Sequence, residues 1–415
     1  MEKKILGYGV IGTGVYCDHY FGTLGPVFKN VRPVGCSDLN TEAAKAAAAR
    51  WNVPKVYSTE EMLADPEVDI VIILTNPSSH YSLTMAALKA GKHVYCEKPL
   101  ADSLEQANEI VEFAAEKGLF VGSAPDTFLT PEFQTVRRLL DENAIGKVIS
   151  VTANYVGPGA DLWHPNAGYL YKKGVGPALD MGPYFLTSLV TLLGPIESVF
   201  CYANRGWDVR KIWDKDVEVE VNTNYCAVLK FCSGVIGNLN LTYDEWKSSL
   251  PGMELYGTDG VLYAPDPNAM MGPIKLLKAE DFKALVNGKG DNMGARLGAI
   301  YGPESAALFT EIDTLAPRVG NQRGSGVSDM AAAIVEGRRP RVSADLCRHV
   351  TEGINAFDVS VRTGVPYQMT TTSTRCRSGP FFRRSMYMNA CRLPLTAAAR
   401  GRCWYRPTRR RSPEL

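Results

Sequence analysis

The sequence predicts an α/β protein with an N-terminal doubly wound domain and a C-terminal α+β domain built on a large, mostly antiparallel open sheet. In the first part of the chain, apolar strands alternate with helical segments of about 10 to 15 residues, which is typical of βαβ units and a parallel sheet. From about residue 196 onward, strand patterns dominate and follow one another through short connections. We therefore expect domains over residues 1–125 and 126–373, followed by a different tail over 374–415.

A glycine-rich turn follows the first predicted strand, residues 5–11. It reads Gly12-Thr13-Gly14-Val15-Tyr16-Cys17, with a small residue where a third glycine or alanine often stands. The first glycine allows a tight turn, the second lets the backbone approach a pyrophosphate, and the phosphates lie at the start of the next helix. We expect a Rossmann-type domain in which a dinucleotide is bound by Gly12, Thr13, Gly14, Val15 and Tyr16.

The second predicted strand, residues 31–37, ends at Asp38. A carboxylate at this point can accept hydrogen bonds from the hydroxyls of the adenine ribose and repels a 2′-phosphate, which favours NAD over NADP. The alternative is that Asp38 caps the Ala-rich helix predicted over residues 41–51. We favour the ribose.

The next long strand, residues 68–74, is almost wholly apolar, as expected for a strand buried on both faces. Thr75 and Asn76 follow directly, at the carboxyl edge of the sheet, where they suit the ribose or the amide of the cofactor. His80 lies near the start of a helix predicted over residues 79–90. It is a candidate for contact with the cofactor, but it can also satisfy local backbone groups, and for this residue we favour the structural role.

The central strand of this sheet ends in Cys96-Glu97-Lys98-Pro99. Ligands bind at the carboxyl edge of open α/β sheets, and the proline holds Lys98 in an extended conformation. We expect Glu97 and Lys98 to line the cofactor site and the Lys98 ammonium group to reach the substrate. The alternative is a solvated lysine beside a turn. A helix over residues 103–117 and a strand over 119–122 complete the domain.

The second domain begins with a helix over residues 131–142 and an alternating strand over 148–155. A polar loop with Trp163 and His164 comes before Asp180-Met181-Gly182-Pro183-Tyr184. A helix should start at Gly182, because proline is tolerated at the first helical position. The later predictions are strands over 196–203, 217–231, 235–243, 253–257 and 261–263, mixed helix and loop over 264–322, and helices over 326–336 and 343–362.

The composition is that of a soluble globular protein, with 45% apolar and 21% charged residues. No apolar run is long enough to span a membrane, and the first four residues lead into a strand without a signal-peptide core. We expect a cytoplasmic protein without membrane contacts. The ten cysteines include no Cys-x-x-Cys pair, and we expect no metal site.

The tail differs from the rest of the chain. Residues 375–415 hold 11 arginines and a single acid, Glu414, for a net charge of +10; the whole chain carries +1, which leaves −9 on the body. We interpret the sequence from about residue 374 as the product of a shifted reading frame or an altered expression sequence, and as disordered. The alternative is a basic arm for nucleic acid or an anionic surface. No groove-reading motif supports that alternative, so nucleic acid is not an expected partner.

With these residues in place, the chain resembles the Gfo/Idh/MocA family (glucose–fructose oxidoreductase and inositol dehydrogenase relatives) over about residues 4–373. The motifs that carry the resemblance are Gly12-Thr13-Gly14, Thr75-Asn76-Pro77-x-x-His80, Gly91-Lys92-His93-Val94-Tyr95-Cys96-Glu97-Lys98-Pro99, Gly146-Lys147 and Gly174-x-Gly176-Pro177-x-Leu179-Asp180-Met181-Gly182-Pro183-Tyr184. The resemblance implies NAD(P)-dependent oxidation of a sugar, polyol or related hydroxyl compound, or reduction of the matching carbonyl. It also implies a homodimer or homotetramer through the C-terminal sheet, whose second face is free for another subunit.

The resemblance assigns catalytic roles to Lys98 and Asp180. Many members have histidine four residues after that aspartate, where this chain has Tyr184, as do some sugar and dihydrodiol oxidoreductases of the family. We expect the nicotinamide to take the hydride and Lys98, Asp180 and Tyr184 to handle the proton. A tyrosine has an unperturbed pKa of about 10, and a nearby Lys98 ammonium group would favour its phenolate. Asp180 then orients Lys98 or binds a substrate hydroxyl.

Further candidates for substrate contact are Asp126, Tyr155, Trp163 and His164. Trp163 can stack on a sugar ring, or it can anchor its loop. A rival to the enzyme is a catalytically silent dinucleotide-binding sensor or regulator of the same fold. Reduction of an unrelated carbonyl or imine is a third possibility.

Overall fold

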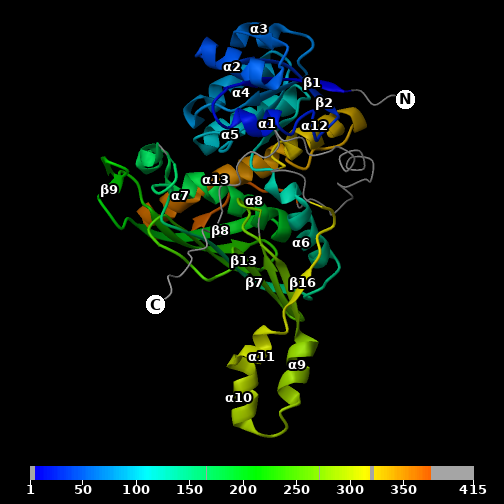
Figure 1. Cartoon of the computed structure of the whole chain (residues 1–415), viewed down its shortest axis with the longest axis vertical. Coiled ribbons are helices and arrows are strands. Elements are labelled where there is room, and N and C mark those ends of the chain that lie inside the picture. The colour runs from blue at the N-terminus through cyan, green and yellow to red at the C-terminus, as the bar shows by residue number, and fades with distance from the viewer. Residues whose placement is uncertain (1–4, 165, 271, 318–321, 375–415) are drawn as a thin grey trace, which may run out of the picture. The chain divides into compact units, whose positions relative to one another are not determined.

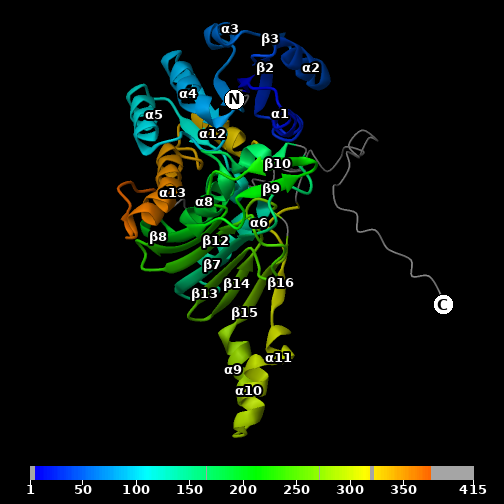
Figure 2. The same cartoon turned by 90° about the vertical axis from the view of Figure 1, so that its left-hand side faces the viewer.

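The computed structural model describes residues 5–164, 166–270, 272–317 and 322–374, and Figures 1 and 2 show it from two sides. The arginine-rich segment, for which disorder or a shifted frame was predicted, lies outside these residues from position 375 on. No described helix is both long and apolar enough to cross a membrane.

The N-terminal part is a parallel six-stranded sheet with the order β3-β2-β1-β4-β5-β6. This is the strand order of a doubly wound dinucleotide-binding fold, which confirms the predicted class. The strands are β1 Leu6–Ile11, β2 Val31–Ser37, β3 Lys55–Val56, β4 Ile70–Ile73, β5 His93–Cys96 and β6 Val121–Ser123. The helices are α1 Cys17–Phe21, α2 Thr41–Trp51, α3 Thr59–Ala64, α4 His80–Lys89 and α5 Leu104–Glu116.

Polar residues at the helix starts explain where the helices of this domain begin. The Asn40 side chain accepts hydrogen bonds from two amides at the start of α2, and Ser103 does the same for one amide of α5. Ser58 and Glu61 form a reciprocal capping box on α3. Between the helices, all four residues of β4 are buried, as its apolar sequence predicts.

The second sheet has nine strands in the order β16-β15-β14-β13-β7-β12-β11-β8-β17. All neighbouring pairs are antiparallel except β7 and β12, which confirms a mostly antiparallel sheet. The strands are β7 Val148–Val156, β8 Ile196–Asn204, β11 Asn224–Phe231, β12 Ile236–Thr242, β13 Met253–Gly257, β14 Gly260–Ala264, β15 Ile274–Lys278, β16 Thr310–Ile312 and β17 Tyr367–Gln368.

Helices cover one face of this sheet (Figure 2). They are α6 Pro131–Asp141, α8 Gly182–Leu193 and α13 Ala344–Thr363. Helix α13 packs on α8 and β8 of the second domain. It also packs on α5 and β6 of the N-terminal domain, so it joins the two domains. The strands expose large side chains on the opposite face, among them Tyr202, Val228 and Ile236. Because residues alternate across a strand, neighbours of these side chains, such as Leu229, point into the helical layer.

Two stretches differ from the sequence predictions. Residues 217–231, predicted as one strand, divide between β11 and β10 Lys215–Glu218, which forms a separate hairpin with β9 Val209–Ile212. The local alternation cannot reveal this break, because both pieces are extended. Within the stretch predicted as mixed helix and loop, three helices lie between β15 and β16: α9 Ala279–Asn287, α10 Met293–Tyr301 and α11 Pro303–Ala306 (Figure 1).

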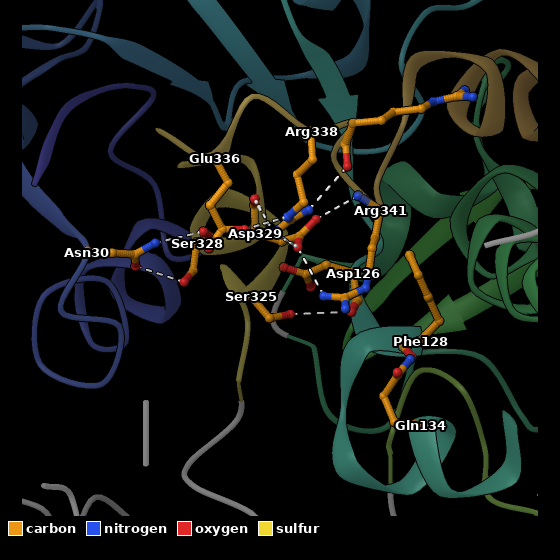
Figure 3. Close-up of polar contacts among 11 residues, drawn as sticks. Asn30, Asp126, Phe128, Gln134, Ser325, Ser328, Asp329, Glu336, Arg338 and Arg341 are labelled. Carbon is orange, nitrogen blue, oxygen red and sulfur yellow. Dashed lines mark hydrogen bonds and ion pairs between the residues drawn. The ribbon is translucent and has the colours of Figure 1, made fainter. Parts of the chain in front are cut away.

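Helix α12, Ser325–Glu336, is fastened to the N-terminal domain although it follows the second sheet in sequence. Asn30 exchanges two hydrogen bonds of 2.8 Å with Ser328, one to its carbonyl and one from its hydroxyl (Figure 3). The fully buried Asp329 carboxylate pairs with Arg338 at 2.8 Å and Arg341 at 3.1 Å. The Asn30 bonds tie the first turn of α12 to the segment before β2, and the Asp329 ion pairs tie the chain after α12 back to the helix.

Candidate active site

Lys98 and Asp180 form an ion pair across 82 residues of sequence. Lys98 follows β5 at the carboxyl edge of the first sheet, and Asp180 ends the short helix α7, Gly176–Asp180. The Lys98 Nζ lies 2.6 Å from Asp180 Oδ1 and also donates to the Asp180 carbonyl at 2.9 Å. Burial lowers the pKa of Lys98, but the Asp180 carboxylate, with contributions from Tyr16 and Glu97, more than offsets this and raises the pKa above its ordinary value.

The second Asp180 oxygen accepts a hydrogen bond of 2.6 Å from the Tyr243 hydroxyl. Burial raises the pKa of Asp180, but the Lys98 ammonium group and the Tyr243 hydroxyl outweigh it and hold the pKa below its ordinary value. Asp180 is thus a carboxylate whose two oxygens each hold a donor. Of the two roles expected for it, the geometry supports the one that orients Lys98.

Tyr184 lies two residues into α8, which starts after a break at Met181 with Pro183 in its first turn. Its side chain is 2% exposed, and its hydroxyl accepts a hydrogen bond of 2.9 Å from Arg323 Nη1. The Lys98 Nζ lies 5.5 Å from the centroid of the Tyr184 ring. The cation at the hydroxyl is therefore Arg323, where the sequence led us to expect Lys98.

Burial raises the pKa of Tyr184, and Arg323 lowers it only in part, so the pKa stays above its ordinary value. The Tyr184 hydroxyl also lies 3.4 Å from that of Tyr16, in the glycine-rich turn. One cluster thus joins the turn to the start of α8. Tyr184 is a phenol in this arrangement, Lys98 an ammonium group and Asp180 a carboxylate.

The glycine-rich turn has room for a phosphate group. Gly12 adopts a φ of +97°, and a Cβ there would meet the Leu74 carbonyl carbon at 2.8 Å, so only glycine fits. A Cβ at Gly14 would meet nothing within 4 Å, which leaves the backbone open on that side. Between them Thr13 is buried, and Val15 beyond them is 86% exposed.

Asp38 is tied to this turn. Its Oδ2 accepts hydrogen bonds from the Thr13 amide at 2.7 Å and the Thr13 hydroxyl at 2.9 Å, and its Oδ1 accepts from the Asn40 amide at 2.9 Å. Burial raises the pKa of Asp38, but these donors together lower it. Asn40, and not Asp38, supplies the side chain that caps α2. The alternative in which Asp38 caps this helix is therefore wrong.

Three other candidates at the sheet edge have partners within the protein. His80 is fully buried, and its ring nitrogens lie 2.7 Å from the Pro99 carbonyl and 3.0 Å from the Thr75 carbonyl. Glu97 is buried and accepts a hydrogen bond of 2.9 Å from the Tyr20 hydroxyl. The Thr75 hydroxyl lies 2.7 Å from that of Ser79, the last residue of the 3₁₀ turn Pro77–Ser79, which Asn76 precedes. His80 therefore holds the Thr75 and Pro99 loops together.

The four further substrate candidates divide into two groups. Tyr155 packs edge-on against Tyr243, with ring centroids 6.0 Å apart, and His164 is close enough to Asp180 to help lower its pKa. Trp163, 68% exposed, packs edge-on against His164. Asp126 is elsewhere: it is 1% exposed, and one of its oxygens accepts from the amides just before and within the first turn of α12. Tyr155 and His164 therefore lie near Asp180, Trp163 is linked to it only through His164, and Asp126 lies under the start of α12.

Sequence reasoning missed three polar residues of this cluster, Tyr243, Asn268 and Arg323. Tyr243 follows a strand and resembles any strand-end tyrosine, and Asn268 lies in the stretch whose pattern was least readable. Arg323 stands directly before Gly324 and a predicted helix, where an arginine is usually solvated. The described residues hold no group of three or more His, Cys, Asp or Glu side chains arranged to bind a metal ion.

The fold, with its glycine-rich turn at the carboxyl edge of a parallel sheet, defines an α/β protein with a dinucleotide-binding domain. Residues 6–124 match the model of an oxidoreductase family with an NAD-binding Rossmann fold, named GFO/IDH/MocA, and residues 133–263 match a C-terminal domain of the same family. The chain belongs to the GFO/IDH/MocA family, as the sequence motifs indicated.

Several relatives have known activities. Over 235 residues the chain is 31% identical to 1,5-anhydro-D-fructose reductase of Ensifer adhaerens, covering 55% of this chain and 67% of that protein. Over 280 residues it is 29% identical to trans-1,2-dihydrobenzene-1,2-diol dehydrogenase of Mus musculus, covering 65% and 79%. Among solved structures, levoglucosan dehydrogenase in complex with NADH and L-sorbose has a TM-score of 0.72 at 20% identity, over 89% of this chain and 100% of that one. That last likeness concerns the fold.

Proposed function

We propose that this protein is an NAD-dependent oxidoreductase that transfers a hydride between a nicotinamide and a secondary alcohol of a sugar, polyol or related carbohydrate. The observation that carries the proposal is the Lys98–Asp180 pair beside Tyr184, at the carboxyl edge of the dinucleotide-binding sheet. Relatives named for a sugar reductase and a diol dehydrogenase support the substrate class.

The residues present fit a dinucleotide. Gly12 makes the tight turn and Gly14 leaves the backbone open to a phosphate group. Asp38 stands at the end of β2, where a ribose hydroxyl can bind its remaining lone pairs. When bound, the nicotinamide supplies the hydride acceptor or donor. We propose NAD over NADP, because a 2′-phosphate beside the Asp38 carboxylate would place two negative charges together.

The protonation states suit delivery of a proton to a carbonyl oxygen. Lys98 and Tyr184 both hold their protons, with pKa values raised above the ordinary ones, and Asp180 keeps the ammonium group in place. Alcohol oxidation needs one of these donors to lose its proton first, so its rate should rise with pH, and carbonyl reduction should be favoured at neutral pH. Lys98 also stabilises negative charge on the substrate oxygen.

The aromatic residues near Asp180 suit a carbohydrate. Tyr155 and His164 offer hydrogen-bonding groups, and Trp163 offers an exposed ring for the apolar face of a sugar. Asp126 acts in this proposal as a support for α12, since its described contacts are backbone amides.

The proposal includes an assembly of identical chains through the open face of the nine-stranded sheet, as a homodimer or homotetramer. We also propose two domains, over residues 1–125 and 126–373. Helix α12 belongs to the second domain by sequence and is hydrogen-bonded to Asn30 of the first. A cytoplasmic location stays a prediction.

The test is NADH formation by the purified protein with NAD or NADP over a panel of sugars, inositols and polyols, together with NADH oxidation by the matching carbonyls. Lys98→Ala should abolish turnover. Lys92→Ala is the matched control, because Lys92 is also buried, precedes the same strand at its opposite end and donates to the Asp65 carbonyl. Tight NADH binding without turnover in either direction would instead support the silent sensor.

A further inference from the structure

Arg323 occupies a position between the two domains. Its residue is 9% exposed, and its guanidinium group donates to the Tyr184 hydroxyl at 2.9 Å and to the Asn268 side-chain oxygen at 3.0 Å. The guanidinium carbon also lies 5.1 Å from the ring centroid of Tyr184 and 5.9 Å from that of Tyr16. One side chain therefore contacts the start of α8 and the glycine-rich turn.

The backbone around Arg323 is held from both directions. The Thr23 hydroxyl, from the segment after α1, donates to the Arg323 carbonyl. The amides of Gly324 and Gly326 donate to Asp126 at 2.9 and 2.8 Å. The Ser325 hydroxyl donates to the Asp126 carbonyl (Figure 3). These buried contacts fix the backbone from which the Arg323 side chain extends.

The chemistry of the contact is specific. A guanidinium group is planar, permanently charged and donates through a rigid fork, so Tyr184 and Asn268 can be held at once. A phenol has one proton and two acceptor positions, and Arg323 uses an acceptor position. The Tyr184 proton must therefore point elsewhere. The positive charge at 2.9 Å also favours the phenolate that remains when the proton has left.

We propose that Arg323 is a positioning residue for the reaction: it fixes the Tyr184 hydroxyl and favours its ionised form, while Lys98 is committed to Asp180. The inference rests on the proposed role of Tyr184 in proton transfer. It assigns to Arg323 the electrostatic task that the sequence motifs assign to Lys98. Asn268 then serves as the second anchor that keeps the fork aligned.

The test compares Arg323→Met, Arg323→Lys, Tyr184→Phe and the Arg323→Met/Tyr184→Phe double variant. Arg137→Met is the matched control, because Arg137 is similarly buried but binds Asp141 and the Thr191 carbonyl, on helices α6 and α8. For each protein we would measure kcat and KM against pH, NADH affinity by fluorescence, and the melting temperature.

Tyr184→Phe should lower kcat by about 100-fold or more, as expected for loss of a proton-transfer group. Arg323→Met should lower kcat by about 10- to 100-fold, with KM and NADH affinity little changed, because a hydrogen bond from a charged donor is lost. The rising limb of the oxidation profile should move to higher pH. Arg323→Lys should recover part of the rate, since it keeps the charge without the fork.

In the Tyr184→Phe background, Arg323→Met should cost little more, because the group through which it acts is gone. If Arg323→Met lowers kcat as much in the Tyr184→Phe background as in the wild type, the inference is overturned. It is also overturned if Arg323→Met leaves the pH limb unmoved and only lowers NADH affinity and melting temperature, to the same extent as the Arg137→Met control. If Tyr184→Phe is impaired and Arg323→Met is fully active, only the Arg323 inference fails. If Tyr184→Phe is fully active, the proton role proposed for Tyr184 fails with it.

A measurement that needs no catalytic turnover tests this inference separately from the proposed function. In protein labelled with carbon-13 at the tyrosine Cζ, the Tyr184 resonance is the one that disappears in Tyr184→Phe. Arg323→Met should shift that resonance at constant pH, and Arg137→Met should leave it in place. An unshifted resonance overturns the inference even if no alcohol or carbonyl on the panel is converted.

Discussion

The two sides of the candidate site hold their cations in different ways. On one side, the Lys98 ammonium group meets a carboxylate, and each charge stabilises the other against burial. On the other side, the Arg323 guanidinium group meets a neutral phenol and an amide oxygen. There burial raises the pKa of Tyr184 more than Arg323 lowers it.

The difference shows how one site can hold two proton donors whose pKa values respond in opposite directions when the partner of each is removed. Removing the partner of Lys98 lowers the pKa of the donor, whereas removing the partner of Tyr184 raises it. The ion pair belongs to recognisable motifs at both ends, and the arginine–tyrosine pair does not. The first pair is therefore expected from sequence, and the second is a property of the folded chain.

The largest expected effect comes from breaking the first side. Lys98→Met removes the ammonium group and leaves the Asp180 carboxylate with Tyr243 as its donor, so we expect kcat to fall by about 10²- to 10⁴-fold. Steady-state kinetics in both directions measure this. Lys92→Met, which alters a buried lysine at the other end of β5, should keep its rate. A rate that survives Lys98→Met would remove Lys98 from the reaction.

The second prediction compares how the pH dependence of alcohol oxidation shifts when the partner of Lys98 or the partner of Tyr184 is removed. Asp180→Asn removes the carboxylate that raises the pKa of Lys98, so an oxidation limb set by Lys98 should move to lower pH, with kcat reduced by about 100-fold. Arg323→Met should move a limb set by Tyr184 to higher pH. The variant that moves the limb of kcat/KM further identifies the group that carries the proton, because Asp180 acts most strongly on Lys98 and Arg323 on Tyr184. Two shifts in the same direction contradict the model.

A smaller effect is expected at Asp38, outside both sides of the comparison. Asp38→Asn keeps the shape of the side chain but removes the charge that opposes a 2′-phosphate. The ratio of kcat/KM for NADP over that for NAD should rise about tenfold, equivalent to about 1.4 kcal/mol. Neither pH limb should move. An unchanged cofactor ratio would show that Asp38 does not face the ribose.

The smallest effect on the reaction is expected on the open face of the nine-stranded sheet. Tyr202→Glu combined with Val228→Glu places charges on that face and should lower the mass measured by light scattering to that of one chain. The rate should stay within about twofold, as for surface changes remote from a site. Val335→Glu, on the exposed side of α12, is the control for added charge. Unaltered mass in the double variant would exclude this face as the interface.

Much of the fold follows from local patterns. The apolar run that became β4 and the polar caps at Asn40 and Ser103 mark their elements without reference to the rest of the chain. The helices α9 to α11 were not predicted clearly. Helix α9 has no buried residue and α10 buries only Ala299, so these helices contribute little to the core of the described chain.

The sequence by itself determined which residues we propose for the chemistry: the turn at Gly12 and the acid at Asp38 from their places at strand ends, and Lys98, Asp180 and Tyr184 from the motifs of the family. Their spacing reflects local needs, such as a tight turn or a strand end, that any chain segment reveals. Only the tertiary structure decided which cation meets which partner. Arg323 lies 139 residues from Tyr184, and a buried charge takes whatever partner the packing of α12 and α8 brings within hydrogen-bonding distance.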